Sequence, residues 1–224
     1  LGGLAGVGRP DAAAQAIAGG AAGITVHLRE DRRHIRDSDV QQLHTSVTVP
    51  LHLEMAATDE MVQIACQIRP RTAMLVPEGR LEVTTEGGLD VADSQSHLTD
   101  VVSRLRDAGI PTSAFVDAQP RQIEAAAACG FAVCEVHTGP FAHAHHASAS
   151  SDETTAALET VARTGSLILQ HGMQFNAGHA LNYTNVAAVA ALPGLQELHI
   201  GHAIISRSIT TGLQKAVRDM VRIV

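Results

Sequence analysis

The sequence has few aromatic side chains, which make up 2% of its 224 residues, and it contains no tryptophan. It also lacks long apolar runs, since none reaches the roughly 18 residues that a membrane-spanning helix needs. No signal peptide opens the chain. We therefore expect a cytoplasmic protein with no membrane partner, whose core is built from small aliphatic side chains.

Positive charge and reactive thiols are also scarce. The formal net charge is −7, which argues against a nucleic-acid partner because nonspecific binding needs a basic face. The single lysine, Lys215, lies in the last predicted helix, and this position nearly eliminates an aldolase that works through a lysine Schiff base. The cysteines Cys66, Cys129 and Cys134 form no CxxC pair, so we predict reduced, buried thiols.

The sequence does contain seven short apolar runs, each ending in polar, titratable or glycine residues. They cover residues 23–30, 51–55, 72–78, 112–118, 132–139, 174–180 and 197–203. Alanine-rich, helix-periodic stretches separate them, a pattern that predicts an α/β protein with a parallel sheet. Chemistry at the same end of successive strands is typical of a (β/α)8 TIM barrel, here with extra helices and forming one domain over residues 1–224.

A closed barrel needs eight strands, and the sequence supplies seven runs. We expect the first strand to be absent from this sequence and to precede Leu1. A doubly wound open sheet would satisfy the same alternation and stays an alternative. Among the connecting segments, we predict helices over 94–109, 119–130, 152–172, 182–192 and 210–224, and a loop over 143–151.

The strongest chemical signal is the segment GITVHLREDRRHI. Strand alternation places His27 and Arg29 on the barrel-facing side, with Arg32, Arg33 and His34 just beyond the strand. Arginine binds phosphate bidentately, so these residues indicate a phosphorylated, carbonyl-bearing substrate. The alternatives are a solvated loop of arginine–aspartate pairs and a satisfied core histidine.

Carboxylates inside apolar strands give the second signal. Glu54 lies in LHLEM, where burial would raise its pKa and make it a candidate general base. Glu135 and His137 alternate in AVCEVHTG and so share a face. A structural salt bridge remains the alternative for each carboxylate.

Glycine–histidine pairs end the last two strands, at Gly178-His179 and at Gly201-His202. Glycine lets backbone N–H groups approach a ligand closely, and a following helix N-terminus suits an anion. Tight turns are the simpler alternative. Thr84 belongs to a polar loop over residues 83–91, which is either a lid that binds hydroxyl groups or an ordinary turn.

Three histidines, His143, His145 and His146, have a spacing that could bind metal. A tract of this kind in a Ser/Ala-rich segment is more often solvated surface. We therefore predict no metal site.

Taken in order, the strings GITVHLREDRRHI, LHLEMA, LVPE, EVTTEGGLDV, EVHTG, NAGH and IGHAII resemble the pyridoxine 5′-phosphate synthase family over nearly the whole chain. The resemblance implies a homo-octamer of (β/α)8 barrels with neither metal nor organic cofactor. It implies condensation of 3-amino-2-oxopropyl phosphate with 1-deoxy-D-xylulose 5-phosphate to give pyridoxine 5′-phosphate, phosphate and water.

The resemblance also implies roles for ten positions. It makes His27 and Glu54 proton acceptors, His179 a proton donor and Glu135 a transition-state stabiliser. It makes Arg29, His34 and Thr84 ligands of the deoxyxylulose phosphate, and Ala180, Gly201 and His202 ligands of the amino-ketone phosphate.

The sequence departs from the family pattern in two places. Residues 1–10 match none of the substrate-binding residues of the family's first strand, and Ala180 stands where the family usually has glycine. A degenerate barrel that binds phosphate ligands or assists assembly without activity is therefore the alternative function. Another phosphate-binding barrel, such as an isomerase or a metal-dependent aldolase, is a further one.

Overall fold

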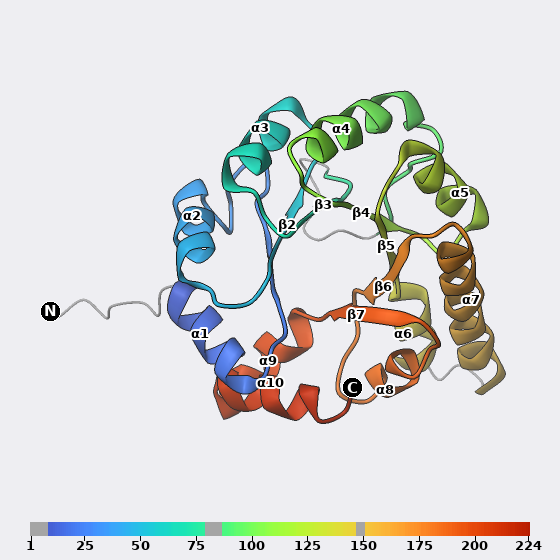
Figure 1. The fold of residues 1–224 in the computed structure, drawn as a ribbon. Coiled ribbons are helices and arrows are strands. Elements are labelled where there is room, and N and C mark those ends of the chain that lie inside the picture. Colours follow the sequence, from blue (N-terminus) through green and yellow to red (C-terminus); the bar gives the residue numbers. More distant parts are fainter. Residues whose placement is uncertain (1–8, 79–86, 147–150) are drawn as a thin grey trace, which may run out of the picture.

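The computed structural model describes residues 9–78, 87–146 and 151–224. Its strands form one parallel sheet, drawn at the centre of Figure 1. They are β1 (Ile24–His27), β2 (Leu51–Met55), β3 (Thr72–Leu75), β4 (Thr112–Val116), β5 (Val133–His137), β6 (Gln174–Gly178) and β7 (Leu195–His199). Each of the seven predicted runs therefore overlaps a strand, β2 has the predicted bounds, and β7 begins before its predicted run, at Leu195.

The strands follow one another in sequence order, from β1 to β7. A doubly wound sheet reverses its strand order at a switch point, whereas the wall of a barrel does not. The sequential order therefore supports the predicted barrel architecture over the open-sheet alternative. Among the described residues β1 pairs only with β2 and β7 only with β6, so this sheet is a curled wall with two free edges.

Helices surround the sheet on its outer side (Figure 1). They are α1 (Arg9–Gly19), α2 (Asp37–Ser46), α3 (Asp59–Ile68), α4 (Gln95–Asp107), α5 (Pro120–Cys129), α6 (Gly139–His146), α7 (Ser151–Gln170), α8 (Val186–Ala190), α9 (His202–Thr211) and α10 (Leu213–Val221). None of these described helices is both long enough and apolar enough to cross a membrane. The predicted apolar face of α4, with Leu98, Val101, Val102 and Leu105, is buried as expected.

Two segments differ from the sequence-based expectation. Residues 143–146 were expected in a loop but form the end of α6, because Phe141 and Ala142 on that helix are buried against the core. The closing helix expected over 210–224 is divided between α9 and α10. The break falls at Gly212, whose φ of +78° favours glycine and ends the regular helix.

The two faces of the sheet have different chemistry. Apolar strand residues such as Leu53, Leu75 and Val136 join the main core with the helices. Polar residues on the alternate positions are buried as well, among them Glu135, which is 3% exposed, and Asn176, which is 2% exposed. The barrel interior is thus a polar environment of low solvent access, which is what a site built from titratable groups needs.

Candidate active site

The ends of β1, β2 and β3 bring a histidine between two carboxylates. The sheet register pairs His27 directly with Glu54. Nδ1 of His27 lies 3.8 Å from Oε2 of Glu54, and Nε2 lies 3.4 Å from Oε1 of Glu78. The predicted inward orientation of His27 is therefore confirmed.

Glu78 connects these groups to the segment that follows β1. Its side chain is 4% exposed and lies 3.7 Å from Nε of Arg29. Its other oxygen accepts a hydrogen bond from the backbone N–H of Glu30 at 3.0 Å. Arg29, Glu30, Asp31 and Glu78 also line a cavity of about 360 Å³, so Arg29 lies beside an open volume that it shares with three acidic residues.

The environments of His27 and Glu54 shift their pKa values strongly. Burial, followed by the cations Arg29 and His34, lowers the pKa of His27 to about 4. Burial and the negative charge of Glu135 raise the pKa of Glu54 to about 7, against the opposing charge of His199. His27 is consequently neutral at pH 7 and able to accept a proton, and Glu54 is poised between its two states.

The cationic segment beyond β1 has two kinds of arginine. Arg32 donates to Asp37 and contacts Glu60, and Arg33 pairs with Asp31. The alternative reading of arginine–aspartate pairs is therefore correct for Arg32 and Arg33. Nε of Arg29 also lies 3.5 Å from Oδ1 of Asp31, and Arg29 differs from the other two arginines in being only 5% exposed, at the barrel mouth.

On the other side of the barrel, Glu135 on β5 lies beside the end of β7. Its Oε2 is 2.8 Å from Nδ1 of His199. Nε2 of His199 faces Oε2 of Glu197 at 3.4 Å. Burial by itself would lower the pKa of His199, but the charges and contacts of Glu135 and Glu197 outweigh it and raise the pKa to about 10.

Close packing against Gly178 fixes the side chain of Glu135. A methyl group at Gly178 on β6 would clash with Oε1 of Glu135, so the absence of a side chain there is required for this carboxylate position. This close approach explains the glycine of the predicted Gly178-His179 pair without a ligand.

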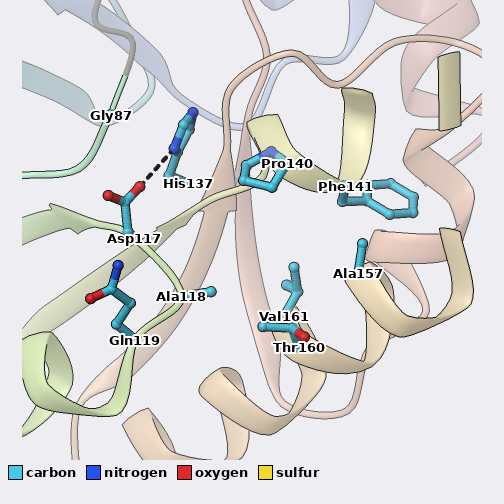
Figure 2. Close-up of a pocket in the computed structure, with 10 residues that line it drawn as sticks. All are labelled: Gly87, Asp117, Ala118, Gln119, His137, Pro140, Phe141, Ala157, Thr160 and Val161. Atoms are coloured by element: carbon cyan, nitrogen blue, oxygen red, sulfur yellow. Dashed lines mark hydrogen bonds and ion pairs between the residues drawn. The ribbon is translucent and has the colours of Figure 1, made fainter. Parts of the chain in front are cut away.

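A second histidine pair lies where β5 and β6 end. The rings of His137 and His179 meet edge to face, with centroids 4.8 Å apart. Nδ1 of His137 is 2.9 Å from Oδ1 of Asp117, a contact drawn as a dashed line in Figure 2. Burial and the neighbouring His137 lower the pKa of His179. His179 is thus connected to the site through its ring contact with His137 on β5. Its backbone φ of +78° is uncommon for a residue other than glycine.

The backbone after β6 stays in the left-handed region for a second residue, because Ala180 has a φ of +58°. Thr138 stabilises this turn, since its hydroxyl donates to the carbonyl of His179 at 2.6 Å and to that of Gly178 at 2.7 Å. Two consecutive non-glycine residues in this conformation store strain, which clusters at functional sites.

The remaining predicted ligands are placed less closely. Gly201 precedes α9 and His202 begins it, and both residues are exposed. His202 is close enough to His179 to contribute to the lowering of its pKa. His34 is exposed beyond Arg29 and close enough to influence His27. Thr84 lies outside the described residues.

A further cavity of about 410 Å³ opens on the far side of His137, between the ends of β4 and β5 and the helix α7. Figure 2 shows Asp117 and His137 on one side of it and Phe141, Ala157 and Val161 on the other. Its apolar wall distinguishes it from the charged volume beside Arg29.

Sequence reasoning gave no role to Glu78, Asp117 or His199, although each lies in one of the predicted runs. The signal was available in their position, because polar residues at the carboxyl ends of barrel strands face the same mouth. Their partners were not readable, since Glu135 and His199 are separated by the whole of β6 and α7.

Comparison with known proteins gives concordant results. The family model described as "Pyridoxal phosphate biosynthesis protein PdxJ" matches residues 8–224. The chain is 61% identical over 215 residues to a pyridoxine 5′-phosphate synthase of Aromatoleum aromaticum, covering 95% of this chain and 86% of that protein. It is 59% identical over 215 residues to a pyridoxine 5′-phosphate synthase of Azoarcus sp., with the same coverage.

Among solved structures, phosphoribosyl anthranilate isomerase from Thermus thermophilus aligns with a TM-score of 0.58 and 13% identity, covering 96% of this chain and 93% of that one. At this identity the likeness concerns the fold alone.

Proposed function

The chain belongs to the PdxJ family, and from that premise we propose that it acts as a pyridoxine 5′-phosphate synthase of vitamin B6 biosynthesis. The reaction joins 3-amino-2-oxopropyl phosphate to 1-deoxy-D-xylulose 5-phosphate and releases phosphate and water. Schiff-base formation, dehydration and ring closure all require proton transfers, which positioned side chains can carry out without a metal or an organic cofactor.

For the proton acceptors, we assign His27 and Glu54. The observation that carries the proposal is the cluster formed by His27, Glu54 and Glu135, in which one imidazole is held neutral and one carboxyl titrates near pH 7. A general base works best when its pKa is close to the working pH. The side chain of Glu135 is 4% exposed and is held in place by close packing against Gly178. It is therefore suited to stabilise positive charge that develops on the substrate.

For the proton donor, we assign His179. Its lowered pKa leaves the imidazole neutral at pH 7, so it must take up a proton earlier in the cycle before it donates one. The edge contact with His137 and the strained turn at Ala180 support a fixed orientation of this ring.

The two phosphates have separate candidate positions. Arg29, with His34 and Thr84, is assigned to the deoxyxylulose phosphate, supported by the cavity beside Arg29. Ala180, Gly201 and His202 are assigned to the amino-ketone phosphate. There the N-terminus of the ten-residue helix α9 offers backbone N–H groups to an anion.

The activity test is incubation of the chain with both substrates, followed by detection of pyridoxine 5′-phosphate. We expect product, and we expect it to persist after EDTA treatment. Activity lost with EDTA would favour a metal enzyme instead. Binding of both substrates without product would favour the degenerate-barrel alternative.

The phosphate assignment has its own test. Arg29→Ala should raise KM for 1-deoxy-D-xylulose 5-phosphate tenfold or more, because a buried guanidinium binds phosphate through charge-assisted hydrogen bonds. KM for the amino-ketone phosphate should change far less. Arg33→Ala is the matched control, since Arg33 pairs with Asp31 but does not line the cavity beside Arg29. An unchanged KM in Arg29→Ala contradicts the assignment.

The assembly and location of the protein are proposals as well. From the family resemblance we propose a homo-octamer in the cytoplasm. Sedimentation of the 23.5-kDa chain at about eight times its mass would support the octamer, and a monomer at micromolar concentration would contradict it.

A further inference from the structure

The barrel interior contains a histidine to which neither the sequence nor the family resemblance assigned a role. His199 is the last residue of β7, and its side chain is 12% exposed. Its two ring nitrogens lie against different carboxylates, with Nδ1 2.8 Å from Glu135 on β5 and Nε2 3.4 Å from Glu197 on β7. His27 also lies between two carboxylates, but its nearer contact is 3.4 Å, against 2.8 Å for the contact of His199 with Glu135 across β6.

The protonation state of this ring follows from donor and acceptor chemistry. An ionised carboxylate only accepts hydrogen bonds, and a neutral imidazole has one N–H and one lone pair. A neutral His199 would therefore turn a lone pair toward one of the two carboxylates. The imidazolium donates to Glu197, and its positive charge attracts Glu135, whose Oε2 lies 2.8 Å from Nδ1 as an ion pair without hydrogen-bond alignment.

The groups around His199 come from every strand that faces it. β2 contributes His52, whose ring centroid is 5.5 Å away, and Glu54, which interacts with it through charge. β6 contributes Asn176, a neutral amide that donates to Glu197 at 3.1 Å. The only cationic candidate near His199 among these is His52, and burial lowers the pKa of His52.

We propose that His199 is a positioning residue that remains an imidazolium throughout the working pH range and holds Glu135 as a carboxylate. Glu54 is then the carboxyl of the site that takes up and releases a proton. Without the positive charge, Glu54 and Glu135 would compete for one proton, since two like charges in a buried site disfavour joint ionisation. His199 thus divides the two carboxyls into one fixed charge and one titrating base.

The first experiment reads the ring directly and does not depend on catalysis. Long-range ¹H–¹⁵N spectra of the ¹⁵N-histidine-labelled full chain report both ring nitrogens of each histidine, and His199 is assigned by its disappearance in His199→Asn. We expect both nitrogens to be protonated at pH 8.5, with His52 neutral in the same spectrum as the internal control. A neutral His199 at pH 8 overturns the proposal.

A second variant tests the role of the two carboxylates. Glu197→Gln keeps the shape and an acceptor oxygen but removes one negative charge. We expect the midpoint of His199 titration to fall by a unit or more, while Glu135 still holds the ring. An unchanged midpoint would show that Glu197 does not contribute.

The kinetic arm rests on the proposed function. His199→Asn retains an amide N–H near the position of Nδ1 and removes the charge together with the contact of Nε2 with Glu197. We expect kcat to fall tenfold or more, KM for both substrates to change less than threefold, and the acidic limb of the pH–rate profile to move to higher pH. A profile that keeps its wild-type limb contradicts the charge role. A wild-type chain without synthase activity would refute the proposed function and leave the spectroscopic result to decide the state of His199.

Discussion

The two halves of the barrel mouth hold their histidines in opposite states. In the β1–β3 half, burial and the cations Arg29 and His34 lower the pKa of His27 to about 4. In the β5–β7 half, the carboxylates Glu135 and Glu197 overcome burial and raise the pKa of His199 to about 10. Burial is the main cause of the low pKa of His27, whereas the two carboxylates outweigh burial at His199.

Glu54 lies between these halves and responds to both. It faces His27 across one contact, and the charges of Glu135 and His199 act on it from the other side. In the β1–β3 half, the neutral imidazole of His27 leaves the site a group that can accept protons. In the β5–β7 half, the ion pair of Glu135 and His199 supplies a fixed charge that can stabilise charge on the substrate. The following predictions address this division, beginning with the largest effect.

Removing the titrating carboxyl group of Glu54 should have the largest effect on catalysis. Glu54→Gln should reduce kcat at least a hundredfold, since it replaces a general base with an amide of the same size. Steady-state kinetics with both substrates measures the effect. Near-native turnover would contradict the assignment of Glu54 as the base. Glu60→Gln, at an exposed position of helix α3, is the matched control and should retain activity.

Displacing the carboxylate of Glu135 should impair the β5–β7 half of the site. Gly178→Ala places a methyl group against Oε1 of Glu135, which must shift or leave its contact with His199. Overpacking of this kind costs about 1–3 kcal/mol, so we expect kcat to fall roughly tenfold or more and the protein to lose stability. Urea denaturation and kinetics of the same preparation test both effects. Wild-type stability and turnover would contradict the close packing around Glu135.

Stability should depend on pH in a direction set by Glu54. Its folded pKa of about 7 is above the ordinary value of 4.5, so the folded state favours the protonated form. The contribution of Glu54 to stability is therefore fully present below pH 4.5 and is lost as pH rises through 7. A shift of this size corresponds to about 3–4 kcal/mol, and Glu54→Gln should recover much of it at pH 8.

The measurement is the urea midpoint of wild type and Glu54→Gln at pH 5 and at pH 8. We expect the variant to gain on the wild type at the higher pH. An equal difference at both pH values would show that Glu54 does not titrate in this range.

The smallest effect concerns the strained turn after β6. Ala180 has a φ of +58°, a conformation that costs an L-residue roughly 1–2 kcal/mol relative to glycine. Ala180→Gly should therefore stabilise the protein by about 1 kcal/mol, after the added flexibility of the unfolded chain is taken into account. Thermal unfolding measures it, and Ala187→Gly inside α8 should instead destabilise. A loss of stability in Ala180→Gly would contradict the strain.

Much of the fold was readable because the local patterns agree with the tertiary structure. The run LHLEM predicted β2 with its observed bounds, and alternation correctly turned His27 inward. Periodicity could not show the helix over residues 139–146, because a short tract of alanine and histidine carries little pattern and depends on burial of Phe141.

The sequence identified the residues of the site better than it identified their charge interactions. Glu54 could be selected because a carboxylate stands alone in an apolar strand. The pairing of Glu135 with His199 could not, because these residues are far apart in sequence and meet only when the sheet curls. The occupied state of Arg32 and Arg33 likewise depends on Glu60 and Asp31, which sequence spacing alone cannot rank.

The most direct test of the account is a crystal structure of the chain with 1-deoxy-D-xylulose 5-phosphate bound. We predict the phosphate at Arg29 and His34, and the sugar between the two halves of the mouth, within reach of His27 and Glu54. A ligand bound instead in the cavity beyond His137, with Arg29 and Glu54 untouched, would contradict it.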